Sequence, residues 1–372
     1  MRKTLPLLIG SATLVAASTL TAGAASASTT PGTPRVLTGG LISPLSIDVR
    51  GNGTVYVAQN FAGLLTKVKK NGTSKVIAST EGDELGAVSH FGSVVYYATT
   101  VQGGPEAPPE NPGAKLWRLK NGKSTAIADL YAYEKTKNPD GAKKYGFVNL
   151  PETCAAQFPE ENPATYTGIV DSHPYATVTT KRNVYVADAA ANAILKVNRK
   201  THKIKTVAVL PAAPAINITA EIAEAQGLPS CAAGYSYRFE SVPTDLEIGA
   251  GGKFYVSSLP GGPEDPSLGA RGAIYTVKPS TGKATRIAGG FVGTTGLAVA
   301  KDGTIYVAEL FGGKTGSGRV SVVRPGSGSP KKFITVASPA AIELLGNKLY
   351  VSTDALSDPP GGEITIIPLK KK

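Results

Sequence analysis

The pattern of apolar and polar residues along the chain is dominated by one short segment that recurs six times. The segment alternates apolar residues with small or polar ones around a central tyrosine, as a half-buried β-strand does. The copies span residues 54–60, 93–100, 183–189, 253–259, 304–310 and 348–354. The tyrosines at their centres are Tyr56, Tyr96, Tyr185, Tyr255, Tyr306 and Tyr350.

Each copy is flanked by further strand-like segments and tight turns. An apolar run and a turn precede it, as at 296–303, and a third run and turn follow it, as at 273–282. A fourth run then closes the unit, as at 285–290. The shortest tyrosine spacing is 40 residues, close to one propeller blade of about 40 to 45 residues. The pattern therefore predicts a four-stranded antiparallel blade.

The sixth unit ends after its third strand, at 363–369, and lacks a fourth. Residues 34–40 resemble the fourth-strand segment 285–290. Pairing this N-terminal segment with the last unit would leave no open sheet edge, a general remedy for exposed strands. We therefore expect an all-β fold, a six-bladed β-propeller of four-stranded antiparallel blades, with its ring closed by the mature N-terminal strand.

The repeat also resembles a known family. The segments KDGTIYVAEL (301–310) and NVYVADAAANAILKV (183–197) resemble the NHL-type repeat. From about residue 33 to 369 the chain is similar to the ScyD/ScyE family of secreted bacterial proteins. This resemblance implies a secreted propeller, and it brings no catalytic residue set with it.

The N-terminus has the order of a secretory signal peptide. Arg2 and Lys3 precede an apolar run, and small residues before and at Ala27 offer a cleavage site. We expect residues 1–27 to be removed, leaving 28–372 as a single propeller domain that is secreted and extracellular. No later segment is long and apolar enough to span a bilayer, and we expect a monomer.

Three long insertions interrupt the repeat, at 101–114, 131–172 and 211–241. In such a blade they fall on the same upper face, because they join the second strand to the third or one blade to the next. One-sided elaboration of a repeat scaffold favours a binding face. We expect a small molecule or a protein partner to bind there, against the alternative of tolerated insertion drift.

The chain has two cysteines, Cys154 and Cys231, one in each of the two longest insertions. In an exported protein an even pair favours a disulfide. A metal site would need more Cys or His at short spacing, and a catalytic thiol would need an unpaired cysteine. A short helix is expected at 219–227.

Polar side chains at the ends of the second strands and the starts of the first strands would gather at the upper mouth of the channel. We expect these to bind ligand: Asn60, Glu84, Asp188, Asp245, Glu309 and Asp354. Oxygen ligands suit Ca²⁺ or Mg²⁺, which makes Asp188, Asp245, Glu309 and Asp354 metal-ligand candidates. His173 and Glu309 are the catalytic candidates of an alternative, a metal-assisted lyase or hydrolase. End-of-strand acids also cap turns, so the sequence leans away from an enzyme.

The lower turns carry a strong positive charge. The net charge is +12, and 18 of the 39 Lys and Arg residues fall on these turns, against Asp302 as the single acid. Such a field attracts anionic polymers of the cell envelope; the alternative is a solubilising surface. Sequence-specific nucleic-acid recognition is not expected, since no aromatic residues interleave these lysines.

Overall fold

The computed structural model describes residues 29–101, 112–264, 266–313 and 317–371. The expected signal peptide at 1–27 lies outside these residues, as does most of the insertion at 101–114. Within the described ranges the chain is mostly β-strand. None of the helices in those ranges is long and apolar enough to cross a membrane.

Five sheets share one plan, in which four consecutive strands pair antiparallel, each with the next along the chain. The strands of these sheets are β3 (Pro44–Val49), β4 (Val55–Gln59), β5 (Leu64–Val68) and β6 (Ser74–Ser79); β7 (Glu84–Phe91), β8 (Val94–Thr100), β9 (Ala114–Lys120) and β10 (Lys123–Asp129); β13 (Pro174–Thr179), β14 (Asn183–Asp188), β15 (Ala193–Asn198) and β16 (Ile204–Val209); β19 (Pro243–Ile248), β20 (Phe254–Ser258), β21 (Gly272–Lys278) and β22 (Lys283–Phe291); β23 (Thr294–Val299), β24 (Ile305–Glu309), β25 (Arg319–Val323) and β26 (Lys331–Thr335).

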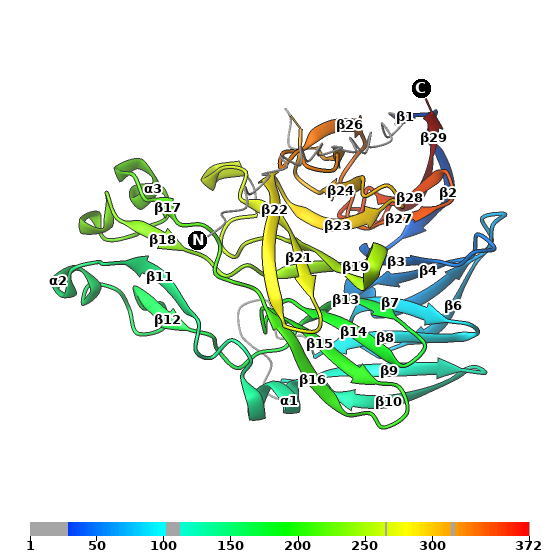
Figure 1. Ribbon diagram of the computed structural model, residues 1–372, viewed down its shortest axis with the longest axis horizontal. Helices are drawn as coiled ribbons and strands as arrows, with labels where there is room; N and C mark the ends of the chain where they lie inside the picture. Colours follow the sequence, from blue (N-terminus) through cyan, green and yellow to red (C-terminus); the bar gives the residue numbers. More distant parts are fainter. Residues whose placement is uncertain (1–28, 102–111, 265, 314–316, 372) are drawn as a thin grey trace, which may run out of the picture.

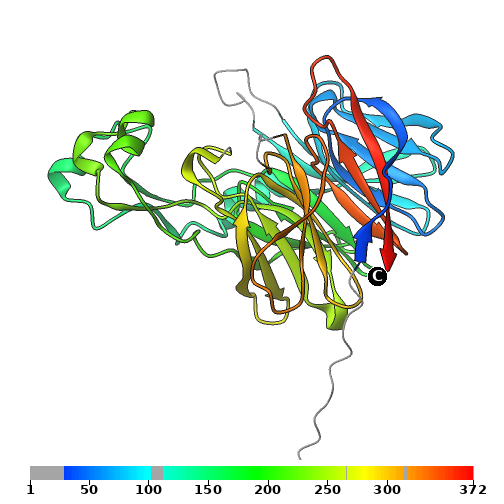
Figure 2. The same cartoon turned by 90° about the horizontal axis from the view of Figure 1, so that it is seen from above.

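The last sheet combines strands from both ends of the chain. β27 (Ile342–Leu345), β28 (Lys348–Thr353) and β29 (Gly362–Lys371) pair in sequence. Two N-terminal strands, β1 (Thr29–Pro31) and β2 (Arg35–Leu41), pair antiparallel with β29, with Arg35 opposite Ile366 and Thr29 opposite Lys371. Figure 2 shows blue β2 beside red β29.

The first strands of the sheets contact one another in cyclic order. β3 contacts β7, β7 contacts β13, and β13 contacts β19; β19 then contacts β23, β23 contacts β27, and β27 returns to β3. Figure 1 shows the sheets succeeding one another in chain order around this centre.

The tight turn between first and second strands has the same chemistry in different sheets. Gly53 and Gly303 adopt φ of +79° and +83°, a region that L side chains rarely occupy. The residue before each glycine caps the turn: Asn52 Oδ1 accepts from Thr54 N at 3.1 Å, and Asp302 Oδ1 accepts from Thr304 N at 2.9 Å. These turns fix the register of the strand that carries the repeat tyrosine.

The apolar faces of neighbouring sheets pack together. Each repeat tyrosine lies in the second strand of its sheet, and Tyr56, Tyr96, Tyr306 and Tyr350 are buried. Tyr306, for example, packs with Leu349 and Ile367 of the next sheet. Its hydroxyl lies 2.7 Å from Thr29 Oγ1, so β1 contacts a neighbouring sheet as well.

The two longest insertions build a sheet of their own, which the sequence did not predict. Its order is β12 (Thr165–Thr167), β11 (Lys144–Val148), β18 (Ser236–Arg238) and β17 (Ile216–Asn217). We call residues 144–167 and 216–238 the insertion module. In both Figure 1 and Figure 2 it projects away from the other sheets.

Short helices and a disulfide complete the insertion module. It holds α2 (Glu152–Ala155), α3 (Ala220–Ala225) and the 3-10 turn η2 (Ser230–Ala232). α3 falls within the expected 219–227, capped by Thr219 Oγ1, which accepts from Ile222 N at 3.2 Å. The expected Cys154–Cys231 disulfide is present, with Cα atoms 5.8 Å apart. Outside the module lie α1 (Leu130–Lys137), η1 (Asn60–Ala62), η3 (Ala250–Gly252) and η4 (Pro266–Leu268).

Candidate functional site

Three of the predicted site residues meet around the carboxylate of Glu84. Glu84 begins β7, Asn60 follows β4, and His173 precedes β13, so three different sheets contribute. Asn60 Nδ2 donates to Glu84 Oε1 at 3.0 Å, and His173 Nε2 lies 2.9 Å from the same oxygen. The His173 side chain keeps 35% of its surface exposed, whereas Glu84 is buried. We call Asn60, Glu84, His173 and Asp188 the mouth cluster.

Asp188 supports this cluster from behind. It is fully buried at the end of β14, where Oδ1 accepts from the His173 backbone N at 2.7 Å and Oδ2 accepts from Ser172 Oγ at 2.6 Å. Burial raises the pKa of Asp188 to about 6. Both carboxylate oxygens accept hydrogen bonds within the turn that Asp188 caps, and one of these bonds holds the backbone of His173 in place.

The His173–Glu84 contact is a charge-assisted pair. Burial lowers the pKa of His173, but the hydrogen bond to Glu84 and nearby carboxylates outweigh it, so the pKa lies above its usual value. For Glu84, burial raises the pKa, but His173 and Asn60 together bring it below the usual value. The imidazole is therefore held as an imidazolium more readily than in water.

Glu309, the acid that ends the fifth repeat, lies inside a different network. It is fully buried, and Arg319 donates to it from Nε at 2.8 Å and Nη2 at 3.1 Å. Ser321 Oγ and the backbone N of Val292 also donate to its oxygens. These donors fix Glu309 at the junction of β22, β24 and β25, and none of them belongs to the mouth cluster.

Asp245 and Asp354 form no hydrogen bond with the mouth cluster in the part of the chain that the structure describes. Asp245, in β19, lines the central channel, and its Oδ2 accepts from Leu297 N at 2.8 Å. Asp354 follows β28 in a left-handed conformation, with φ of 51°. Across the described ranges, no group of three or more His, Cys, Asp or Glu side chains is arranged to hold a metal ion. The four metal-ligand candidates thus do not converge.

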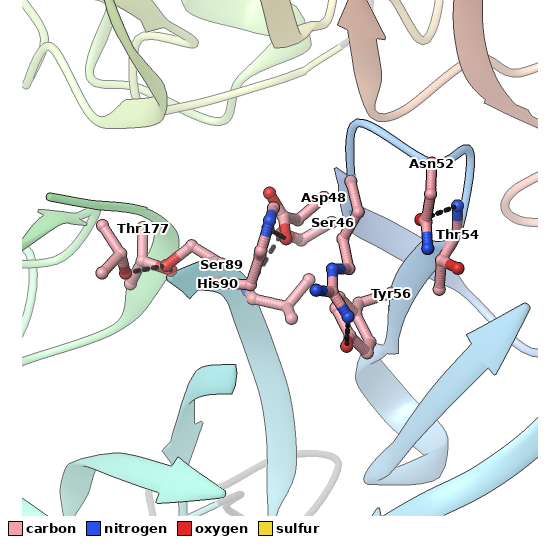
Figure 3. A network of polar contacts seen from close by, with 11 residues as sticks. Ser46, Asp48, Asn52, Thr54, Tyr56, Ser89, His90 and Thr177 are labelled. Atoms are coloured by element: carbon pink, nitrogen blue, oxygen red, sulfur yellow. Dashed lines mark hydrogen bonds and ion pairs between the residues drawn. The ribbon is translucent and has the colours of Figure 1, made fainter. Parts of the chain in front are cut away.

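The central channel contains an acid-lined cavity that the sequence did not indicate. This channel cavity, of about 210 Å³, is lined by Asp48, Asp245, Glu247 and Glu343 from first strands of three sheets. Figure 3 shows His90 of β7 directed at Asp48, to which its Nδ1 is hydrogen-bonded, and Ser89 directed at Thr177. Burial raises the pKa of Asp245 to about 7 and, with Asp245 and Asp48 nearby, that of Glu247 to about 8.

The insertion module carries a larger cavity, of about 740 Å³, which we call the module groove. Its aromatic lining includes Phe158, Tyr166 and Tyr237, and its carboxylates are Glu160, Glu161 and Glu240. Among the described residues that line it, none is Lys, Arg or His. The volume falls in the range of about 300 to 1,000 Å³ typical of small-molecule sites.

Glu240 lies at the base of the module groove. Burial raises its pKa, and Asn192 Nδ2 donates to Glu240 Oε2 at 3.1 Å. The same Nδ2 also donates to Asp140 Oδ2 at 2.8 Å, while Asn192 Oδ1 accepts from Val242 N at 3.0 Å. One carboxamide thus joins both insertions to the turn after β14. No spacing motif in the sequence could have indicated this.

Comparison with known proteins supports the fold. No family model matches the chain, and no curated protein matches it. The PQQ-bound aldose sugar dehydrogenase from Streptomyces coelicolor overlays with a TM-score of 0.55 at 12% identity, covering 93% of this chain and 99% of that one. A structural-genomics protein of unknown function from Bacteroides thetaiotaomicron overlays with a TM-score of 0.55 at 12% identity, covering 91% of this chain and 76% of that one.

These neighbours define the class: the chain has a β-propeller-type fold. They do not show the NHL-type or ScyD/ScyE assignment. The expectation that leaned away from an enzyme is wrong on this comparison, because the aldose sugar dehydrogenase, which shares the fold, is an enzyme. At 12% identity the likeness shows the fold and not an activity.

Proposed function

We propose that the chain is a six-bladed propeller in which the N-terminal strand closes the ring. The cyclic contacts of the first strands and the pairing of β2 with β29 support this proposal. The NHL-type and ScyD/ScyE resemblance of the repeats is part of the same proposal. The Cys154–Cys231 disulfide is compatible with the proposed secretion, since such bonds persist in oxidising compartments.

We infer that the protein binds a small organic cation in the module groove. The observation that carries this proposal is the combination of three carboxylates and three aromatic rings in a cavity of about 740 Å³ whose described lining has no basic side chain. The chain as a whole has a net charge of +12, so the charge of this groove is opposite in sign to that of the chain. The carboxylates would attract the positive charge of the ligand, and the aromatic rings would pack against its apolar part.

Two physical effects would act together on such a ligand. A cation over a Tyr face gains about 0.5 to 2 kcal/mol, the more so when desolvated. The apolar lining, including Leu228 and the exposed Ile169, would bury the hydrocarbon part. A neutral ligand of the same shape would still bury its hydrocarbon part but would lose the interaction between a cation and the tyrosine rings.

The test compares phenethylammonium with two analogues of similar shape, neutral 2-phenylethanol and anionic phenylacetate, by isothermal titration calorimetry. We expect the cation to bind at least fivefold more tightly than the alcohol, and no binding of the anion. Glu161→Gln, at an exposed position of the groove, should weaken the cation and leave the alcohol unchanged. Equal affinity for cation and alcohol, or binding of neither, would overturn the proposal.

A second candidate function, the lyase or hydrolase alternative, is acid–base chemistry at the mouth cluster. The observation that favours it is the partly exposed His173 imidazole hydrogen-bonded to the buried Glu84. A paired histidine can donate or accept a proton near neutral pH. The test measures hydrolysis of p-nitrophenyl acetate by the wild type and His173→Asn, with and without Ca²⁺. An unchanged rate in the variant would exclude this role.

A further inference from the structure

Another group of buried polar side chains lies at the C-terminal end of α1, and its members line neither the channel cavity nor the module groove and are not part of the mouth cluster. Glu134 is fully buried, and neither of its carboxylate oxygens has a hydrogen-bond partner among the described residues. Asp140 is 1% exposed, and its Oδ1 is equally unpartnered within those residues. The carboxamide oxygen of Asn138 is a third buried acceptor without a described donor. Unsatisfied buried acceptors of this kind cost free energy unless something satisfies them.

These three side chains lie at the C-terminal end of α1 and on the segment that follows it. The Asn138 backbone N donates to the Glu134 carbonyl at 2.7 Å and ends the helix in a left-handed conformation, with φ of 35°. The charge of Asp140 acts on Glu134. Asn138 Nδ2 donates to the Gly168 carbonyl at 3.0 Å, and Asp140 lies so close to Gly168 that an added Cβ would be 1.9 Å from its Oδ1.

The surrounding charges favour a cation. Among the described residues, no Lys, Arg or His forms an ion pair with Glu134 or Asp140. Asp188 and Asp171 add negative charge near Glu134. The positive charge that acts on Asp140 is that of Lys143, which is exposed. The C-terminal end of a helix carries a partial negative charge of its own.

We propose that Glu134, Asn138 and Asp140 bind one Ca²⁺ ion. Carboxylate and amide oxygens are the ligands that Ca²⁺ takes, with backbone carbonyls and water completing six to eight positions. Mg²⁺ demands a tighter octahedron and gives up water reluctantly, so a buried set of three side-chain oxygens suits it less well. The set holds two carboxylates and one amide, so it is distinct from the four metal-ligand candidates predicted from the sequence.

The alternative is that these three acceptors are simply left unpaired in the folded protein. In that case no ion binds, and the folded state carries the cost of the unpaired oxygens. Heat and a shift in melting temperature that depend on Ca²⁺ separate a bound ion from a carboxyl group that is merely buried.

The position of the site gives the ion a structural effect. Asp140 Oδ2 also accepts from Asn192 Nδ2 and from the Tyr145 hydroxyl at 3.0 Å. Asn192 in turn contacts Glu240, at the base of the module groove. A bound Ca²⁺ would thus fix the stem from which the insertion module projects.

The test uses the full mature protein, first treated with a chelator and then titrated with CaCl₂ at pH 7. Calorimetry should show one ion bound with a dissociation constant in the millimolar range or tighter. The melting temperature should rise with Ca²⁺, as binding to the folded state requires. No Ca²⁺-dependent heat and no shift up to 10 mM would overturn the proposal.

Three variants locate the effect. Glu134→Gln and Asp140→Asn should weaken Ca²⁺ at least tenfold, and Glu134→Gln should be no less stable than the chelated wild type, because it removes a buried ionisable group. Glu161→Gln, an acid of the module groove, should keep the wild-type Ca²⁺ response. A full response in both site variants, or equal or tighter binding of Mg²⁺ by the wild type, would contradict the assignment.

Discussion

The sheets around the central channel, which we call the large sheets, are stabilised in a different way from the insertion module. Each large sheet packs apolar side chains against the next sheet, as Tyr306 does with Leu349 and Ile367. The insertion module has a small cluster of buried residues, including Phe147 and Ala232, and a disulfide through Cys154. Loss of one contact among the large sheets is therefore felt by two sheets at once, whereas the module can loosen alone.

The buried carboxylates of the two regions also differ, in whether they have hydrogen-bond donors. Glu309, between large sheets, is fully satisfied by Arg319, Ser321 and a backbone donor. Glu134, at the stem of the insertion module, has no described donor at all. A satisfied buried carboxylate holds a structure together, and an unsatisfied one is open to a ligand. Burial alone does not distinguish the two cases, but the donors do.

The largest effect is expected from breaking the Glu309–Arg319 pair. Arg319→Met leaves Glu309 as an uncompensated buried charge, which costs about 3 to 5 kcal/mol. Chemical denaturation should show this loss for the whole set of large sheets. The double variant Glu309→Met, Arg319→Met should recover most of the stability. A loss below 1 kcal/mol in the single variant would mean that the pair is not fixed as described.

A somewhat smaller and more local effect is expected from the disulfide. Replacing Cys154 and Cys231 with Ser should cost about 2 to 4 kcal/mol of stability in the insertion module. Hydrogen exchange should rise in β11, β12, β17 and β18 while β24 and β25 keep their protection. Equal loss of protection in both regions would show that the module and the large sheets unfold as one unit.

The channel cavity should give the protein a pH dependence. Asp245 and Glu247 have raised pKa values of about 7 and about 8, so the folded state holds protons that the unfolded state has released. The free energy of unfolding should therefore fall as pH rises from about 5 to 8. Glu247→Gln should flatten this fall, measured by thermal melts in chelator, whereas the exposed Glu221→Gln should not. A wild-type stability that rises over this range would contradict the prediction.

The smallest effect concerns the basic turns, such as the one between β5 and β6 that holds Lys69 and Lys70. If they bind anionic envelope polymers, retention on purified wall material should weaken several-fold between 50 and 300 mM NaCl, because exposed charges are screened. Replacing Lys69 and Lys70 with Gln should reduce retention slightly. The same change at Lys135 and Lys137 of α1 serves as the control. Salt-insensitive retention would exclude this role.

The sequence predicts the repeated part of the molecule well for a physical reason. A strand with one buried face needs alternation, and a tight turn needs a residue like Gly53 or Gly303, so both leave a local pattern. The pairing of Cys154 with Cys231 could be predicted because the chain has only those two cysteines. The contact between Glu84 and His173 follows from their places at strand ends, and a role for them in binding or catalysis stays a prediction.

The rest could not be predicted because it depends on contacts between distant segments. The sheet of the insertion module pairs β11 with β18, and its strands are too short to show alternation. Asp245 looks like a residue of the channel mouth, yet its position in β19 places it beside Glu247 in the channel cavity. Glu134 looks like an ordinary residue of a polar helix, and only the burial of α1 against β9 makes it unusual.

The pairing of β2 with β29 also sets the order in which the molecule can be assembled. The five four-stranded sheets each use a continuous stretch of chain and can form as soon as that stretch is available. The last sheet requires Arg35 to meet Ile366, so it must wait until almost the whole chain has been made. Until then β2 presents an unpaired edge, and a chaperone that shields it would protect the chain when it is most prone to aggregate.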